Sequence, residues 1–180
     1  MTVGLILAGG HSRRFGSDKA TYYDSQLEQY WIQLAYEKLH VHTKKVLVAA
    51  NENNAQQLQQ LVPAALVLTD QAPFKDKGPL SGLYAAALTN ADDFLIMAVD
   101  YPKLSSDSLE KLLQHPNCYG EDALGNAHYT LAHLQFTTSQ ITDFLTTGNQ
   151  RLRDFLSTLD AHPLQLSQTL TNQNQKEGSS

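Results

Sequence analysis

The sequence contains little cysteine and little positive charge, and both shortages restrict the range of functions that this protein can have. Cys118 is the single cysteine in 180 residues, so no disulfide can form within the chain. We therefore expect a reducing, cytoplasmic setting and interpret Cys118 as a small buried apolar side chain. Lysine and arginine number 13 against 18 aspartates and glutamates, a net charge of −5. This balance argues against nucleic-acid or anionic-membrane partners, because both are bound through phosphate neutralisation.

Long apolar runs and metal-binding histidine patterns are also missing. The first apolar stretch, residues 3–8, is too short for a signal peptide or a membrane span. None of the seven histidines belongs to an H-E-x-x-H pattern, so a zinc site would lack ligands. A length of 180 residues predicts one domain. We place this domain at residues 1–170 and a polar tail at 171–180.

Short apolar segments alternate with segments of helical periodicity. We expect buried strands at 3–8, 45–50, 65–69 and 94–99, and helices at 25–40, 53–61, 80–88 and 106–113. Such alternation is typical of an α/β fold with a mostly parallel, doubly wound sheet. Farther along, segments 118–123 and 128–134 flank a turn at 125–126, and helices are expected near 139–146 and 150–159. This second part predicts an antiparallel lobe at one edge of the sheet.

The segment after the first predicted strand is rich in glycines and cations. Gly9 and Gly10 follow the strand directly, and Arg13, Arg14 and Lys19 come soon after. Glycine lets the backbone approach a phosphate with its N–H groups free, and the cations neutralise the phosphate charge. Doubly wound sheets bind ligands beyond the carboxyl ends of their strands. The sequence therefore favours a polyphosphate site here over a simple turn with a solvated basic face.

The spacing of this loop differs from three common motifs. A P-loop, G-x-x-x-x-G-K-[ST], is excluded because five residues separate Gly10 from Gly16, and Lys19 comes three positions later. The dinucleotide fingerprint G-x-G-x-x-G and the nucleophile elbow G-x-S-x-G are both absent from the loop. These differences argue against P-loop GTPases, dinucleotide-binding dehydrogenases and serine hydrolases.

Asp100 ends the predicted strand at 94–99, at the same sheet edge as the glycine loop. Pro102 then stops further strand pairing. One carboxylate together with substrate phosphates is a common way of holding Mg²⁺, so we interpret Asp100 as a metal ligand. The alternative role, capping the next helix, fits Ser105 and Ser106 better.

Two other predicted strands also end in polar residues, Asn51 and Asp70. A carboxylate accepts hydrogen bonds from both N1–H and the N2 amine of guanine, which makes Asp70 a candidate for reading that base. Asparagine and aspartate are equally common as turn formers, so both interpretations stay open for these residues. The sequence G-P-L-S-G at 78–82 predicts a sharp loop into a helix whose N-terminus offers further N–H groups.

Together these motifs resemble the MobA family of molybdenum cofactor guanylyltransferases. The ordered set is L-A-G-G-x-S-R-R-F-G-x-D-K at 7–19, Asn51, Asp70, G-P-L-x-G at 78–82 and V-D-x-P at 99–102. The resemblance implies a three-layer, Rossmann-like nucleotidyltransferase fold. It also implies transfer of GMP from GTP to molybdenum-bound molybdopterin, with release of pyrophosphate. The opening L-A-G-G is similar to the guanylyl branch, since cytidylyl relatives typically carry A-A-G there.

The resemblance and the loop chemistry together imply roles for individual residues. The expected catalytic residues are Lys19, Asp100 and Arg13, with Mg²⁺ on Asp100. The expected GTP-binding residues are Leu7, Ala8, Gly9, Gly10, Lys19, Asn51, Asp70 and Asp100. The expected acceptor-binding residues are Gly82, Arg151, Arg153, Asn172 and Asn174. The last two are what the chain keeps of the family's closing N-x-N-T-P-x-x-L.

Two other functions stay open for this sequence. One is a cytidylyl- or sugar-phosphate nucleotidyltransferase of the same fold, and the other is a GTP-binding module that has lost its chemistry. The expected partners are GTP and molybdenum-molybdopterin, and the resemblance adds other proteins of molybdenum cofactor biosynthesis. We expect a monomer without a nucleic-acid or membrane partner.

Overall fold

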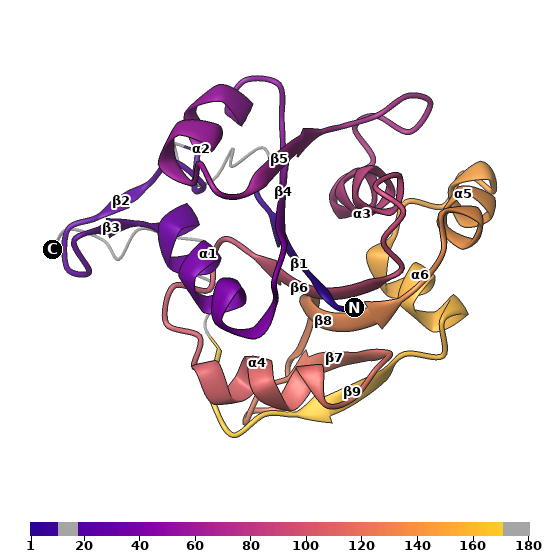
Figure 1. Ribbon diagram of the computed structural model, residues 1–180. Helices are drawn as coiled ribbons and strands as arrows, with labels where there is room; N and C mark the ends of the chain where they lie inside the picture. Colours follow the sequence, from indigo (N-terminus) through magenta and orange to yellow (C-terminus); the bar gives the residue numbers. More distant parts are fainter. Residues whose placement is uncertain (11–17, 171–180) are drawn as a thin grey trace, which may run out of the picture.

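The computed structural model describes residues 1–10 and 18–170 and contains a seven-stranded sheet in the order β5-β4-β1-β6-β8-β7-β9 (Figure 1). Its strands are β1 (Val3–Leu7), β4 (Val46–Ala50), β5 (Leu66–Thr69), β6 (Asp93–Ala98), β7 (Cys118–Glu121), β8 (Ala127–Gln135) and β9 (His162–Gln165). A separate hairpin pairs β2 (Tyr23–Asp24) with β3 (Gln29–Tyr30). The helices are α1 (Trp31–His42), α2 (Ala55–Leu61), α3 (Pro79–Ala87), α4 (Ser106–Leu113), α5 (Thr138–Thr146) and α6 (Leu152–Thr158).

The sheet has a parallel part and an antiparallel edge, as predicted. Strands β5, β4, β1 and β6 are parallel neighbours. Strand β8 runs antiparallel to both β6 and β7, and β9 is parallel to β7 at the edge. The mostly parallel α/β class and the antiparallel pair around the turn at 125–126 are therefore confirmed.

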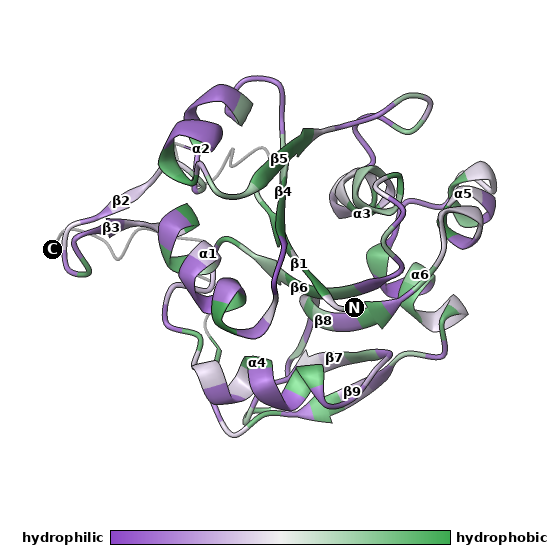
Figure 2. Ribbon diagram, in the orientation of Figure 1, coloured by the Kyte–Doolittle hydropathy of each residue, from purple (hydrophilic) through white to green (hydrophobic). Residues whose placement is uncertain are grey.

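Helices cover both faces of the sheet and make three layers (Figure 1). One apolar core lies beneath α1, α2 and α4 and includes Trp31 and Leu109. The other lies beneath α3, α5 and α6 and includes Leu83 and Phe155. Successive residues of β4 enter opposite cores, so both of its faces are buried and the strand is a continuous apolar run. Figure 2 shows the hydrophobic colour that follows from this along the central strands.

The first helix begins later than the sequence predicts. Residues 25–30 are not helical, because α1 begins at Trp31 after the β2–β3 hairpin. Oδ1 of Asp24 accepts hydrogen bonds from the backbone N–H groups of Gln26 and Leu27, at 3.0 and 3.1 Å. A side chain bonded to the amides that follow it stabilises a turn in competition with a helix. Trp31, the first residue of α1, is 1% exposed and belongs to the core beneath this helix.

Strand β9 was not predicted from the sequence. Its four residues include Pro163 and a single strongly apolar side chain, Leu164, and three of the four are exposed. Proline lacks an N–H group and is tolerated in strands mainly at sheet edges, where β9 lies. A pattern this short carries no periodicity, so only its pairing with β7 identifies it as a strand.

Cys118 lies in β7 and is fully buried. Burial raises the pKa of its thiol to about 11, so little thiolate forms at neutral pH. This agrees with its interpretation as an apolar side chain. No helix among the described residues is both long enough and apolar enough to cross a membrane.

Candidate functional site

The order of the parallel strands indicates that the ends of β1 and β6 are where a ligand would bind. From β1 the chain proceeds outward through β4 and β5, and then crosses to β6 on the other side of β1. Doubly wound sheets bind ligands at the carboxyl ends of strands where this reversal occurs. Leu7 pairs with Ala98, and the N–H group of Val99 donates to the Leu7 carbonyl at 3.2 Å. The loop that begins at Ala8 and the segment after β6 therefore start side by side, as predicted.

Lys19 and Asp100 form an ion pair at this position. Nζ of Lys19 donates to Oδ2 of Asp100 at 3.1 Å, and the two side chains are 14% and 16% exposed. Oδ1 of Asp100 is buried and has no hydrogen-bond partner among the described residues. A buried carboxylate oxygen without a partner is energetically unfavourable, and a divalent cation is a group that satisfies it.

The surroundings of Asp100 fit a cation held mainly by substrate oxygens and water. Among residues 1–10 and 18–170, no group of three or more His, Cys, Asp or Glu side chains could hold a metal ion. Mg²⁺ often binds through one or two carboxylates plus phosphates, which needs no such group. Ser105, not Asp100, caps α4, because its side chain accepts from the N–H group of Ser108 at 3.2 Å. Asp100 therefore fits Mg²⁺, and the capping alternative is wrong.

Two residues that sequence reasoning did not assign hold the ends of the glycine loop. Asn54 is 3% exposed, and its Nδ2 donates both to the Ala8 carbonyl at 3.0 Å and to Oδ2 of Asp18 at 2.7 Å. Oδ1 of Asp18 accepts from the N–H group of Ala20 at 2.9 Å. Asn54 thus links the residue at which the described chain enters the loop to the residue at which it leaves. Its only sequence signal is an asparagine just before a helix.

Gly9 and Asn51 connect the loop to the end of β4. A Cβ on Gly9 would lie 3.3 Å from the backbone carbon of Ala50, whereas at Gly10 no described atom lies within 4 Å of that position. Nδ2 of Asn51 donates to the Gly9 carbonyl at 3.4 Å, and its Oδ1 accepts from the N–H groups of Asn53 and Asn54 at 2.9 Å. Asn51 is therefore both a turn former and a neighbour of the loop.

Asp70 lies at the end of β5, level with Asn51, because Thr69 pairs with Ala50. Its Oδ2 accepts from the N–H group of Asp76 at 2.9 Å, across the loop before α3. This bond is exposed, so the turn-forming interpretation of Asp70 has a direct observation behind it. Its second role, reading guanine, stays a prediction.

The loop before α3 is tied to the first turn of that helix. Oγ of Ser81 accepts from the N–H group of Lys77 at 2.6 Å and donates to the Phe74 carbonyl at 2.9 Å. Gly78 has a φ of +60°, a value that favours glycine, and α3 begins at Pro79, one residue before the predicted start at 80. Gly82 is buried, and a Cβ there would lie 2.7 Å from that of Ala49. Close packing on β4 explains this glycine, and its contact with an acceptor stays a prediction.

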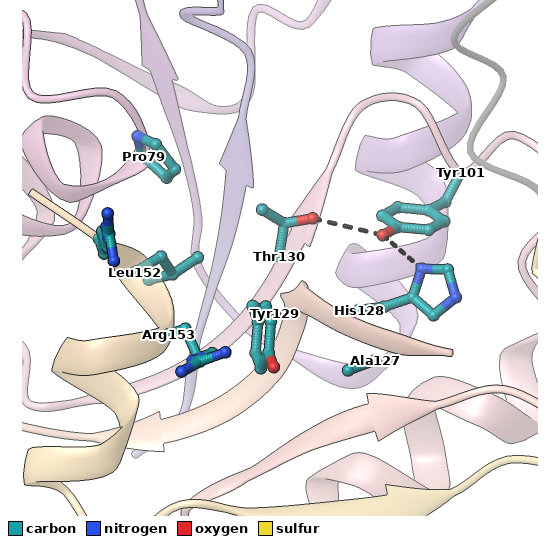
Figure 3. A pocket seen from close by; sticks show the side chains of 9 residues that line it. Pro79, Tyr101, Ala127, His128, Tyr129, Thr130, Leu152 and Arg153 are labelled. Carbon is teal, nitrogen blue, oxygen red and sulfur yellow. Dashed lines mark hydrogen bonds between the residues drawn. The ribbon is translucent and has the colours of Figure 1, made fainter. Parts of the chain in front are cut away.

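A pocket of about 470 Å³ opens beside Tyr101, the residue after Asp100 (Figure 3). It is lined by Pro79, Tyr101, Ala127, His128, Tyr129, Thr130, Arg151, Leu152 and Arg153. Arg151 and Arg153, both predicted to contact an acceptor, therefore share one cavity with the start of α3. Arg13, Asn172 and Asn174, and also Arg14, lie outside the described residues, as does the predicted tail at 171–180.

Named relatives of the chain belong to one group of enzymes. A protein of Geobacillus sp. (strain WCH70), named probable molybdenum cofactor guanylyltransferase, is 27% identical over 127 residues, 70% of this chain and 63% of its own. A protein of Yersinia pseudotuberculosis (serotype O:1b), named molybdenum cofactor guanylyltransferase, is 28% identical over 173 residues, 91% of this chain and 84% of its own. The match thus spans less than two thirds of the Geobacillus protein and most of the Yersinia protein.

A solved structure shares the fold. The crystal structure of molybdopterin-guanine dinucleotide biosynthesis protein A from Archaeoglobus fulgidus matches with a TM-score of 0.70 at 18% identity, over 91% of this chain and 83% of that one. Residues 4–164 also match the family described as the MobA-like NTP transferase domain. Because this match covers most of the chain, the protein belongs to the family of MobA-like NTP transferase domains.

Proposed function

We propose that this chain transfers GMP from GTP to molybdenum-bound molybdopterin, which yields the molybdopterin guanine dinucleotide cofactor and pyrophosphate. The names of the Geobacillus and Yersinia relatives support the choice of substrates. The observation that carries the chemistry is the 3.1 Å contact between Lys19 and Asp100, beside a buried carboxylate oxygen without a described partner. Both residues lie at the sheet edge where this fold class binds ligands.

In this proposal GTP lies along the carboxyl ends of the parallel strands. Its phosphates lie over the loop formed by Leu7, Ala8, Gly9 and Gly10, where no atom of the described residues lies within 4 Å of the position of a Cβ on Gly10. The guanine lies toward Asn51 and Asp70, at the ends of β4 and β5. The Asp70 carboxylate accepts from N1–H and the N2 amine of guanine, in addition to or in place of its exposed bond with Asp76.

Asp100 is the proposed ligand of Mg²⁺, through the oxygen that has no described hydrogen-bond partner. When bound, Mg²⁺ neutralises negative charge on the reacting phosphates. Lys19, held beside Asp100, supplies a further positive charge at the α-phosphate. Arg13 is the residue we propose to neutralise the departing pyrophosphate.

The acceptor phosphate of molybdopterin is the proposed nucleophile. One of its oxygens forms a bond to the α-phosphorus of GTP, while the bond from that phosphorus to the bridging oxygen of the β-phosphate breaks. The electron pair of the broken bond leaves with pyrophosphate. Because the nucleophile is already an anion, the protein needs to align the two phosphates and neutralise charge rather than remove a proton.

The acceptor is proposed to occupy the pocket beside Tyr101. Arg151 and Arg153 line this pocket and provide planar cations suited to a phosphate. Gly82, Asn172 and Asn174 are the further residues proposed on the acceptor side. Other proteins of molybdenum cofactor biosynthesis are the proposed source of the acceptor.

Thermal unfolding with Mg²⁺ and each of GTP, CTP, ATP and UTP tests the donor. A ligand at about 100 times its dissociation constant adds roughly 2.7 kcal/mol, which raises the midpoint of a domain of this size by about 5–10 °C. We expect the unfolding midpoint to rise with GTP and not with the other three nucleotides, and only when Mg²⁺ is present. A response to CTP instead would indicate a cytidylyltransferase, and no response to any nucleotide would contradict the proposed phosphate site. Binding of GTP without pyrophosphate release in the presence of acceptor would indicate a module that has lost its chemistry.

A further inference from the structure

A chain of buried polar side chains runs along one wall of the pocket and ends at the residue next to Asp100. Nε2 of His128 lies 3.1 Å from Oδ2 of Asp122, and Nδ1 of His128 lies 3.0 Å from Oη of Tyr101. The Tyr101 hydroxyl also lies 3.3 Å from Oγ1 of Thr130 (Figure 3). Asp122, His128 and Tyr101 are 0%, 8% and 3% exposed. A buried network of this kind fixes the positions of its members when all are hydrogen-bonded.

Asp122 determines which groups donate and which accept in this network of hydrogen-bonded side chains. Its carboxylate accepts from the N–H groups of Leu124 and Asn126, at 2.9 and 3.0 Å. The hydrogen bond from Asn126, with a smaller contribution from His128, holds the pKa of Asp122 well below its ordinary value. An ionised carboxylate only accepts, so Nε2 of His128 donates to it. In the neutral imidazole, Nδ1 is then the acceptor for the Tyr101 hydroxyl.

Tyr101 joins this chain to the carboxylate at the end of β6. It follows Asp100 directly, and both lie beyond the last residue of that strand, Ala98. The Tyr101 ring contacts the His128 ring edge-on, with centroids 5.7 Å apart. Because His128 and Thr130 belong to β8, these contacts attach the segment after β6 to a neighbouring strand of the same sheet.

We propose that Tyr101, His128 and Asp122 are positioning residues that hold Asp100 in place to bind a divalent cation. The inference rests on the proposed function, from which the cation is taken. It adds that the metal carboxylate and the acceptor pocket share one rigid connection, through Tyr101, which lines the pocket and is adjacent to Asp100.

Mn²⁺ binding in the presence of GTP, followed by electron paramagnetic resonance, tests this assignment. Tyr101→Phe keeps the ring and removes the hydroxyl together with its contacts to His128 and Thr130, and we expect a loss of about 5- to 10-fold in Mn²⁺ affinity, on the scale of hydrogen bonds lost from a buried network. His128 allows the two bonds to be separated. In His128→Gln, the side-chain amide keeps a donor near the position of Nε2 for Asp122 and loses the acceptor for Tyr101. In His128→Asn, the side-chain oxygen keeps an acceptor near the position of Nδ1. An amide side chain has no tautomers, so this variant does not depend on Asp122 to fix one. We expect His128→Gln to behave like Tyr101→Phe, and His128→Asn to bind Mn²⁺ within about twofold of wild type, because the bond to Tyr101 is retained.

His133 provides a matched control on the same strand. It is buried and bonded to another aspartate, with Nε2 2.8 Å from Oδ1 of Asp93 and Nδ1 3.0 Å from the Leu112 carbonyl. We expect His133→Gln and His133→Asn to lower the unfolding midpoint without changing Mn²⁺ affinity. Equal losses of affinity in His133→Gln and His128→Gln, or unchanged affinity in Tyr101→Phe and His128→Gln, would overturn the inference and leave the proposed function standing. A wild-type chain that binds no Mn²⁺ with GTP would overturn both.

Discussion

Nζ of Lys19 lies 3.1 Å from Oδ2 of Asp100, although 81 residues separate the two along the chain. The parallel pairing of β1 with β6 accounts for this proximity, since Lys19 follows the loop after β1 and Asp100 follows β6. The second carboxylate oxygen of Asp100 is buried without a described hydrogen-bond partner. The pair therefore combines a cation at a defined position with an oxygen suited to bind a metal ion.

Replacing Asp100 distinguishes its proposed role in metal binding from its contribution to the stability of the fold. We expect Asp100→Asn to remove the Mg²⁺-dependent part of the GTP stabilisation and to lower turnover at least about a thousandfold, since a metal contributes several kcal/mol to such a reaction. The metal-free midpoint should stay within about 3 °C of wild type, because the loss of the ion pair is offset by removal of a largely buried carboxylate charge whose Oδ1 has no described partner. Thermal unfolding and pyrophosphate release measure the two effects. Asp143→Asn, an exposed change on α5, is the control, and near-normal Mg²⁺-dependent turnover in Asp100→Asn would contradict the assignment.

Asn54 should matter for both the fold and GTP binding. Asn54→Ala leaves the Ala8 carbonyl and the Asp18 carboxylate without their shared donor, which should cost about 2–3 kcal/mol and lower the midpoint by about 5–10 °C. The Michaelis constant for GTP should rise, because these bonds hold both ends of the loop. Asn53→Ala, one residue earlier and exposed, should change neither quantity. Equal effects of the two substitutions would show that the bonds of Asn54 do not hold the loop.

Asp70 is expected to select guanine. Asp70→Asn replaces one carboxylate oxygen by an amide that donates, so the preference for GTP over ATP should fall about tenfold, in line with the 1–3 kcal/mol of a good paired contact. Competition of the two nucleotides in a binding assay measures this preference. Asp76→Asn is the matched control, because this substitution keeps the backbone N–H group that donates to Asp70. Asparagine also tolerates the φ of +56° at position 76. An unchanged preference in Asp70→Asn would leave Asp70 as a turn former only.

The lowered pKa of Asp122 predicts a pH dependence of stability. A carboxyl group whose pKa is lower in the folded state stabilises the fold above its unfolded value, near 4, and loses this effect as the pH falls through the folded value. The free energy of unfolding of the wild type should therefore decrease below about pH 4. We expect Asp122→Asn to be less stable at pH 7 and to show a shallower decrease in acid, as measured by urea unfolding at several pH values. Parallel pH profiles for the two proteins would show that Asp122 is not the group responsible.

Strands with two buried faces could be predicted almost to the residue. The segments at 3–8 and 45–50 differ from β1 and β4 by one residue at one end, and the segment at 94–99 differs from β6 by one residue at each end, because continuous apolar runs have few alternative structures. The start of α1 could not be predicted, since local hydrogen bonds from Asp24 favour a turn over the helix that the apolar spacing suggests. Strand β9 could not be predicted either, because it depends on pairing with β7.

The candidate site was predictable where its residues belong to segments that follow the carboxyl ends of neighbouring parallel strands. Lys19 and Asp100 meet because parallel strands end at one edge, a consequence of topology that the strand pattern already implies. The contact of Asn54 with Asp18 depends on side-chain rotamers of residues 36 apart, which no spacing rule describes. The pocket needs β8, α6 and the start of α3 to come together, so only the tertiary structure defines it. The assignment of residues 1–170 to one domain, and of Arg13, Asn172 and Asn174 to the site, stays a prediction.

The central claim is transfer of GMP at the site formed by Lys19 and Asp100. The most direct measurement is mass spectrometry of the products formed from GTP, Mg²⁺ and molybdenum-molybdopterin, with pyrophosphate quantified in the same reaction. We expect the molybdopterin guanine dinucleotide and pyrophosphate to form in equal amounts with the wild type, and neither to form above background with Asp100→Asn. Absence of the dinucleotide in a reaction where GTP binds, or its formation at the wild-type rate by Asp100→Asn, would contradict the proposed function or the proposed site, respectively.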